Sequence, residues 1–223
     1  MPCFIYINGY PGVGKLTVAN ALSNLIPRSR VFHNHLVIDP VAAMLDRDDA
    51  DADAGAYNDL RTSFRKHALD AIATHPALAD KTFIFTDARE SGPLGSEAAR
   101  DHKTAADRRG VPFVSVVLRC DADESVKRIA SRVGVGDGVA AGNTKLTDGE
   151  VLLRIRDKET IFQFGDENEM CLDTTSLGSE DAAHLIFQHV NAVYSRLDKD
   201  SRSLCLVSAA KLHRLNLTRR IPD

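Results

Sequence analysis

The chain has 223 residues, 43% of them hydrophobic and 26% charged, which is typical of a folded globular protein and excludes disorder through most of its length. Lysine and arginine total 28 against 31 acidic residues, and this net charge of -3 excludes nucleic-acid binding by bulk positive charge, although not by a local patch. The four cysteines lack zinc spacing and no apolar run approaches the roughly 18 residues of a membrane span, so we expect a cytoplasmic protein with reduced thiols.

Short β-prone runs alternate with helical stretches along the chain. Apolar and β-branched runs predict strands at residues 3–8, 30–33, 82–86, 112–118 and 169–173. Helical apolar spacing predicts helices over residues 16–26, 58–74, 95–109, 123–133, 147–160 and 179–197. This alternation implies right-handed crossovers and an α/β fold with a five-stranded parallel sheet covered by helices on both faces. Ligands of such sheets bind beyond the carboxyl ends of the strands.

Two segments interrupt this alternation. Residues 46–55 are rich in aspartate, but a calcium loop beginning at Asp49 would place Ala54 and Leu60 where glycine and glutamate are needed, so a solvated loop is expected. Residues 134–143 are rich in glycine and lie between two predicted helices, which indicates the tip of a mobile lid.

The strongest motif follows the first predicted strand and opens the first predicted helix. It consists of Gly9, Tyr10, Pro11, Gly12, Val13, Gly14, Lys15, Leu16 and Thr17. Glycines in such a loop let the backbone N–H groups turn inward around phosphate, and the lysine adds a positive charge for the β- and γ-phosphates. Leu16 stands where a serine or threonine normally holds Mg²⁺, and the hydroxyl of Thr17 comes one residue later.

This loop is similar to that of adenylate kinase and its relatives, in which the hydroxyl is also displaced by one residue. The layout of residues 4–197 resembles the small P-loop kinases, such as the nucleoside monophosphate, shikimate, gluconate and chloramphenicol kinases. Residues 33–39 and 145–148 resemble a further group of P-loop kinase-like proteins. The resemblance implies a three-layer α/β/α P-loop NTPase domain over residues 1–197, with a lid at about 134–146, and it leaves residues 198–223 as a basic tail.

In the resembled kinases, residues after the second strand contact the acceptor or act as the base. The candidates here are His35 and Asp39, and a histidine can accept a proton near neutral pH. Structural roles remain open for both, because Asp39 before Pro40 is also a helix N-cap pattern. Asp87 ends the third predicted strand and is a candidate for holding Mg²⁺ or for accepting the acceptor proton, with a surface turn as the alternative. Arg89 is a candidate for gripping the acceptor.

The resemblance also implies residues that contact the nucleotide. Arg128 and Arg132 lie four residues apart on a predicted helix, and Arg132, beside the lid, is the better candidate for closing over the phosphates. Thr175 follows the fifth predicted strand, in the loop that packs against adenine in the resembled kinases. Thr147 and Glu150 form a predicted capping box that starts the helix after the lid.

These patterns predict an ATP-dependent phosphotransferase that moves the γ-phosphoryl group of MgATP to a small-molecule acceptor. Lys15, Asp39, His35, Asp87 and Arg132 are the catalytic candidates, with Thr17 and Asp87 as the metal candidates. One alternative is a nucleotide-binding regulatory protein with weak NTPase activity. Another, favoured only by the basic tail, is a polynucleotide-end kinase. No membrane partner is expected, and neither the acceptor nor the oligomeric state follows from the sequence.

Overall fold

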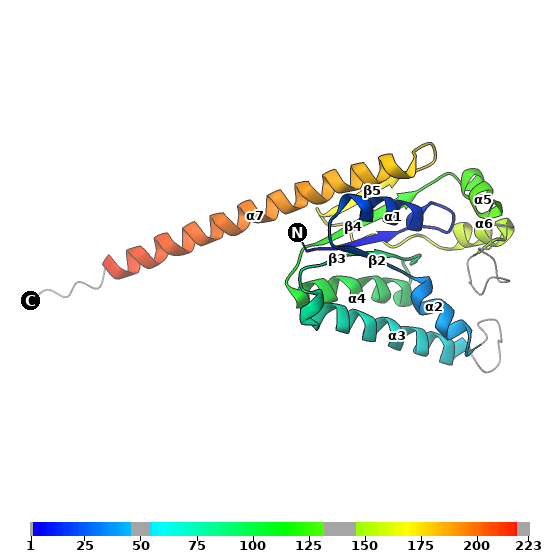
Figure 1. The fold of residues 1–223 in the computed structure, drawn as a ribbon, viewed down its shortest axis with the longest axis horizontal. Helices are drawn as coiled ribbons and strands as arrows, with labels where there is room; N and C mark the ends of the chain where they lie inside the picture. The colour runs from blue at the N-terminus through cyan, green and yellow to red at the C-terminus, as the bar shows by residue number, and fades with distance from the viewer. Residues whose placement is uncertain (1, 46–53, 132–145, 218–223) are drawn as a thin grey trace, which may run out of the picture. The chain divides into compact units, whose positions relative to one another are not determined.

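The computed structural model describes residues 2–45, 54–131 and 146–217 (Figure 1). Arg132 and the predicted lid tip at residues 134–143 therefore lie outside the described residues. The chain divides into two compact units, Met1–Phe187 and Gln188–Asp223. In the second unit the described residues continue a single helix, which ends at Leu217 rather than at the predicted residue 197.

The first unit contains five parallel strands, and the predicted positions of all five are confirmed to within a residue or two at each end. They are β1 (Phe4–Asn8), β2 (Ser29–His33), β3 (Thr82–Thr86), β4 (Phe113–Arg119) and β5 (Glu169–Asp173). Their order across the sheet is β2-β3-β1-β4-β5. The chain leaves β1 toward β2 on one side, while β4 lies on the other side, so the loop after β1 occupies the point where the strand order reverses.

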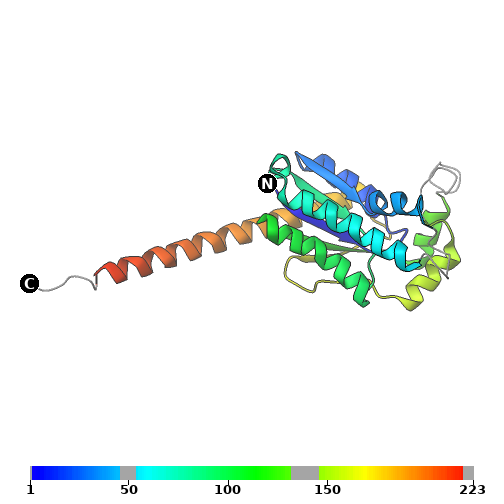
Figure 2. The same cartoon turned by 90° about the horizontal axis from the view of Figure 1, so that it is seen from below.

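Helices connect the strands and cover the sheet. They are α1 (Lys15–Leu25), α2 (His35–Ala42), α3 (Ala54–Thr74), α4 (Pro93–Arg109), α5 (Ala122–Ala130), α6 (Gly149–Lys158) and α7 (Ser179–Leu217), with a 3-10 turn at Pro76–Leu78. Figure 2 shows α3 and α4 side by side across one face of the sheet. α1 and the first turns of α7 lie on the other face (Figure 1). The three-layer α/β/α arrangement is thus confirmed.

Successive side chains of β1 point to opposite faces of the sheet, so this strand packs against both helix layers. Phe4 and Tyr6 belong to an aromatic core cluster with residues of α3 and α4, and Asn8 continues on that face by the two-residue period. Ile5 and Ile7 point to the opposite face and are fully buried. Because both faces of the three central strands are covered, β1, β3 and β4 are almost unbroken apolar runs, and sequence pattern located them well.

Three helix starts contradict a predicted cap or loop. α2 begins at His35 after the N-cap residue Asn34, so the prediction that Asp39 caps this helix is wrong, and Pro40 lies inside it. α6 is capped by Asp148 rather than by Thr147, because the Asp148 carboxylate accepts from the N–H groups of Glu150 and Val151 at 2.8 and 3.2 Å. α3 begins at Ala54, so the last two residues of the expected acidic loop are helical.

Candidate functional site

The phosphate loop joins β1 to α1 and requires glycine at positions where no side chain fits. Gly12 has a φ of 86°, and a Cβ there would lie 2.7 Å from the Ser125 carbonyl oxygen. A Cβ at Gly9 would lie 2.6 Å from the Leu118 carbonyl oxygen. The N-cap of α1 is Gly14, so no side chain caps the first-turn N–H groups of this helix. A loop that wraps an uncapped helix start in this way forms a cradle for an anion.

Lys15 places its charge across the mouth of this loop. Its Nζ donates hydrogen bonds to the carbonyl oxygens of Gly9 at 2.7 Å and of Tyr10 at 2.8 Å. The ammonium group is therefore held at the site that a phosphate would enter. Thr17 lies exposed in the first turn of α1, and Leu16 beside it is half-buried.

A second wall of the loop comes from the segment after β5. The Thr174 hydroxyl donates to the carbonyl oxygen of Val13, at 2.9 Å, and thereby joins this segment to the phosphate loop. The predicted nucleotide contact Thr175 lies next to it, and its hydroxyl accepts from the N–H of Asp121 at 2.9 Å. The structure thus brings Thr175 close to the phosphate loop from a position about 160 residues later in the chain.

Arg128 of α5 lies between the segment after β5 and the phosphate loop. Its guanidinium donates to the carbonyl oxygens of Thr174 at 2.7 Å and Thr175 at 3.0 Å, and it is paired with Glu124 at 2.9 Å. Its Nη1 lies 3.9 Å from the position that a Cβ on Gly14 would occupy. Arg128 therefore adds positive charge beside the start of α1.

The carboxyl end of β3 carries a buried ion pair. Asp87 is 3% exposed, and its Oδ2 accepts from Nε of Arg89 at 2.7 Å. Burial raises the pKa of Asp87, but the charges of Arg89, His102 and Arg61 outweigh this and lower the pKa to about 2. The other oxygen, Oδ1, accepts from the N–H of Ala88 at 2.9 Å. Asp87 is thus an ionised carboxylate with both oxygens engaged.

His102 of α4 lies beneath this pair, and no sequence pattern pointed to it. Its ring packs between Tyr6 and Phe85, with centroid distances of 4.8 and 4.9 Å. Burial lowers the pKa of His102 to about 4, although the neighbouring Asp87 charge acts in the opposite direction. His102 is therefore neutral at physiological pH.

The segment after β2 lies beside the end of β3. The N–H of Asn34 donates to the Thr86 carbonyl oxygen at 3.0 Å, and the Asn34 side chain accepts from Arg61 of α3 at 3.2 Å. The rings of His33 and His35 lie 6.2 Å apart in this segment. Arg61 also acts on the pKa of Asp87, so α3 supplies a positive charge between the two strand ends.

Asp39 lies one helical turn after His35, inside α2 and half-buried. The structure therefore groups the base candidates His35, Asp39 and Asp87 on the β2–β3 side of the phosphate loop, and Arg128 and Thr175 on the β4–β5 side. Arg61 was missed because a lone arginine on a predicted helix has no distinguishing pattern.

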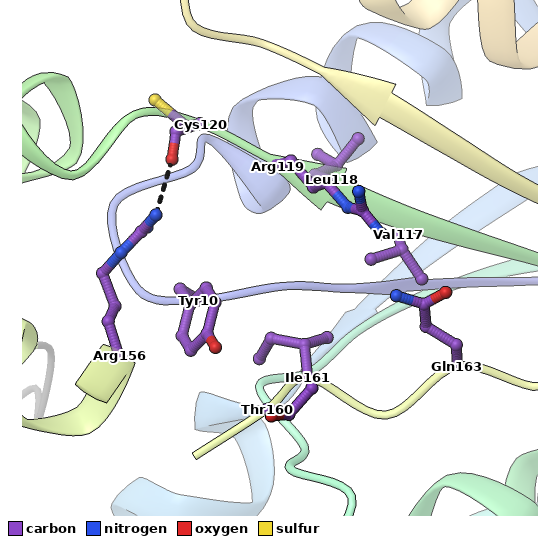
Figure 3. Close-up of a pocket in the computed structure, with 9 residues that line it drawn as sticks. All are labelled: Tyr10, Val117, Leu118, Arg119, Cys120, Arg156, Thr160, Ile161 and Gln163. Carbon is purple, nitrogen blue, oxygen red and sulfur yellow. Dashed lines mark hydrogen bonds between the residues drawn. The ribbon is translucent and has the colours of Figure 1, made fainter. Parts of the chain in front are cut away.

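A cavity of about 230 Å³ lies next to the phosphate loop on the β4 side (Figure 3). Tyr10 and Arg156 form one wall, with the guanidinium 4.7 Å from the ring centroid, and Arg156 also donates to the Cys120 carbonyl oxygen at 2.9 Å. Ile161 and Gln163 lie on the side of the segment that follows α6. Among the candidate residues that the structure describes, Tyr10 alone lines this cavity.

The two metal candidates, the Thr17 hydroxyl and the Asp87 carboxylate, suit a magnesium ion that arrives with a nucleotide. Among residues 2–45, 54–131 and 146–217, no three His, Cys, Asp or Glu side chains are grouped closely enough to hold a metal. Mg²⁺ keeps several waters and commonly takes one or two carboxylates plus substrate phosphates, so a full protein cage is not required.

Within the same described ranges, no helix is long and apolar enough to cross a membrane.

A family model described as an AAA domain matches residues 5–138, which is more than half of the chain. The chain belongs to this AAA-domain family. A comparison with curated protein sequences finds no match. The family match contains the phosphate loop, the Asp87–Arg89 pair and Arg128, and the expected resemblance to small P-loop kinases is confirmed at the level of the fold.

Solved structures show which fold this AAA-domain protein has. The gluconokinase from Sinorhizobium meliloti 1021 is 12% identical, with a TM-score of 0.59 and coverage of 90% of this chain and 98% of that one. A sugar kinase from Janibacter sp. HTCC2649 is 14% identical, with a TM-score of 0.56 and coverage of 86% and 95%. The APS kinase of Mycobacterium tuberculosis is 15% identical, with a TM-score of 0.51 and coverage of 85% and 98%. The shared feature is the P-loop kinase fold.

Proposed function

We propose that this protein is an ATP-dependent phosphotransferase that moves the γ-phosphoryl group of MgATP to a small-molecule acceptor. The observation that carries the proposal is the phosphate loop, where Lys15 spans the mouth of a glycine cradle at the uncapped start of α1. The similar APS kinase structure is in complex with AMPPNP and APS, which supports nucleotide binding by this fold.

The loop residues Gly9–Thr17 bind the triphosphate in this proposal. Backbone N–H groups and the positive end of α1 hold the phosphate oxygens, and Lys15 exchanges its two loop carbonyls for the β- and γ-phosphates. Arg128 contributes charge from the β4–β5 side, and Thr175 belongs to the segment that would pack against the adenine ring of the nucleotide. Phosphoryl transfer needs mainly positioning and charge stabilisation, and these are what such residues supply.

Thr17 and Asp87 are the proposed metal ligands. Mg²⁺, when bound, neutralises charge on the phosphate oxygens. The ionised state of Asp87 suits this role, but its oxygens already accept from Arg89 and from the N–H of Ala88. Asp87 would therefore supply negative charge for the metal while it keeps these two hydrogen bonds.

The acceptor lies on the β2–β3 side in this proposal, near the segment after β2 and the Asp87–Arg89 pair. His35 or Asp39 accepts the proton of the acceptor hydroxyl, and Asp87 takes this role if neither does. Asp39 is favoured slightly because the resembled kinases use a carboxylate in this region. Arg132 remains the proposed lid arginine that closes on the phosphates.

Two observations favour a second function, that of a nucleotide-binding regulatory protein with weak NTPase activity. Both oxygens of Asp87 are engaged within the protein, and Leu16 replaces the usual metal-binding hydroxyl. Either feature would slow metal-assisted transfer while leaving nucleotide binding intact.

Thermal unfolding in the presence of ligands separates the two functions. A ligand at 100 times its Kd adds about 2.7 kcal/mol to the free energy of unfolding, which raises Tm by several degrees for a domain of this size. We expect MgATP alone to raise Tm, and an acceptor from a metabolite library to raise it further in the presence of a non-hydrolysable ATP analogue. A response to nucleotide alone, across a broad library, would favour the regulatory function.

A further inference from the structure

Asn8 is the last residue of β1 and directly precedes the phosphate loop. It is 1% exposed, and both ends of its side-chain amide are used. Its Oδ1 accepts from the N–H of Arg89 at 2.8 Å, and its Nδ2 donates to the carbonyl oxygens of Arg89 and Phe162, each at 3.0 Å. One buried side chain thus holds two segments that lie 81 and 154 residues away in sequence.

Those two segments are also joined to each other. Glu90 and Ile161 form an antiparallel bridge, the N–H of Ser91 donates to the Thr160 carbonyl oxygen at 2.7 Å, and the N–H of Phe162 donates to the Arg89 carbonyl oxygen at 2.9 Å. The first segment contains Arg89, the partner of Asp87. The second follows α6 directly. The amide of Asn8 is therefore the point where the phosphate loop, the Asp87–Arg89 pair and the segment after α6 meet.

A second contact runs from the phosphate loop to the same segment. The Tyr10 hydroxyl donates to the carbonyl oxygen of Glu159, and the Tyr10 carbonyl is one of the two that hold Lys15. Asn8 and Tyr10 flank Gly9, the other residue whose carbonyl holds Lys15. A displacement of the loop when Lys15 leaves these carbonyls for phosphate would therefore reach residues 89–91 and 159–162 through Asn8 and Tyr10.

We propose that Asn8 is a positioning residue that couples nucleotide occupancy of the phosphate loop to the placement of the Asp87–Arg89 pair and of residues 159–162. The chemistry favours asparagine, since the site needs one acceptor and two donated hydrogen bonds from a single short side chain. Aspartate has the same shape but has no N–H, and it would direct a carboxylate at two carbonyl oxygens. Leucine fills the same space with no polar group. This inference rests on the proposed nucleotide binding at the loop.

Hydrogen exchange with mass spectrometry tests this coupling without an identified acceptor. The probe is a non-hydrolysable ATP analogue with Mg²⁺, and the proteins are the wild type, Asn8→Asp and Asn8→Leu. The matched control is Ser115→Ala on the neighbouring strand β4, which removes the hydrogen bond of another buried side chain, the one to Glu169 at 2.8 Å.

In the wild type and in Ser115→Ala, we expect the analogue to slow exchange by about threefold or more, both in the phosphate loop and in residues 88–92 and 159–163. In the Asn8 variants we expect the slowing to persist in the loop, to be lost in residues 88–92, and to be reduced in residues 159–163, which keep their contact with Tyr10. Equal slowing of these segments in variants and wild type would overturn the coupling.

The wild-type measurement tests the inference even if the Asn8 variants do not fold. Slowing confined to the loop, with residues 88–92 unaffected, would overturn the coupling and leave the proposed function standing. No slowing anywhere at saturating analogue would overturn the proposed nucleotide binding itself, and the coupling with it.

Discussion

The charge of Lys15 is the residue-scale feature on which nucleotide binding depends. Replacing Lys15 with alanine leaves triphosphate charge uncompensated, and a charge-assisted contact contributes roughly 1.5–3 kcal/mol. We therefore expect Lys15→Ala to weaken ATP binding by about tenfold or more in isothermal titration calorimetry. The control is Lys66→Ala, because Lys66 is an exposed lysine paired with Glu97 on the surface, and its loss should leave ATP affinity unchanged. Equal affinities for wild type and Lys15→Ala would contradict this role.

The Asp87–Arg89 pair makes a second prediction at this scale. Asp87→Asn would leave the guanidinium of Arg89 buried without its counter-charge, and breaking a buried pair on one side typically costs about 3–5 kcal/mol. We expect a loss of this size in the free energy of unfolding measured with urea. The double variant Asp87→Leu with Arg89→Met removes both charges and should recover most of it. A loss below about 1 kcal/mol in the single variant would show that the pair is not buried as described.

His102 makes stability depend on pH. Its pKa of about 4 in the folded protein lies below its ordinary value of 6.5, so protonation favours the unfolded chain. Its contribution, up to about 3 kcal/mol, is fully present above pH 6.5 and is lost as the pH falls toward 4. For Asp87, with a pKa of about 2 against 3.8, the loss follows between pH 4 and pH 2. Urea unfolding at pH 7, 5.5 and 4.5 should show a shallower decline for His102→Gln than for the wild type, and parallel declines would refute the assignment.

At the scale of elements, the start of α6 distinguishes two candidate caps. The Asp148 carboxylate accepts from two backbone N–H groups, so Asp148→Ala should lower the free energy of unfolding by about 1 kcal/mol. Thr147→Ala is the matched control and should change it by less than about 0.5 kcal/mol. The opposite ranking would restore the capping box that the sequence predicted.

The helix after β2 contains both leading base candidates. We expect Asp39→Asn to reduce the transfer rate by about 10²-fold or more while ATP affinity stays close to that of the wild type. His35→Gln should cause the smaller loss. If His35→Gln causes the larger loss, the histidine is the base. Wild-type rates in both variants would leave Asp87 as the base, or a reaction that needs none.

The central strands were predictable because burial on both faces makes them largely apolar runs, as at Thr82–Thr86. Helix starts were less predictable, since several polar residues near a start can act as the cap and the backbone selects one. At α6 the cap is Asp148 rather than Thr147. α2 begins four residues before Asp39, and its N-cap residue Asn34 makes no side-chain capping hydrogen bond, so no capping pattern marked this start. The phosphate loop was predictable because all its parts are contiguous in sequence.

At the scale of the whole molecule, the strand order decides which distant residues meet. β1 lies between β3 and β4, so the phosphate loop has the Asp87–Arg89 pair on one side and the segment of Arg128 and Thr175 on the other. The sequence predicted a parallel sheet but contains no signal for the order of its strands. Asn8, Arg61 and His102 were missed for this reason, because their partners become neighbours only when the sheet is assembled.

Transfer of a labelled γ-phosphoryl group tests the central claim most directly. The full-length protein is incubated with Mg²⁺, ATP labelled in the γ-phosphate and a metabolite library, and the products are separated by mass. The account predicts label in at least one organic phosphate with the wild type, and in none with Lys15→Ala. If the wild type binds ATP but label enters only inorganic phosphate across the library, the protein is a nucleotide-binding regulator and the phosphotransferase claim is wrong.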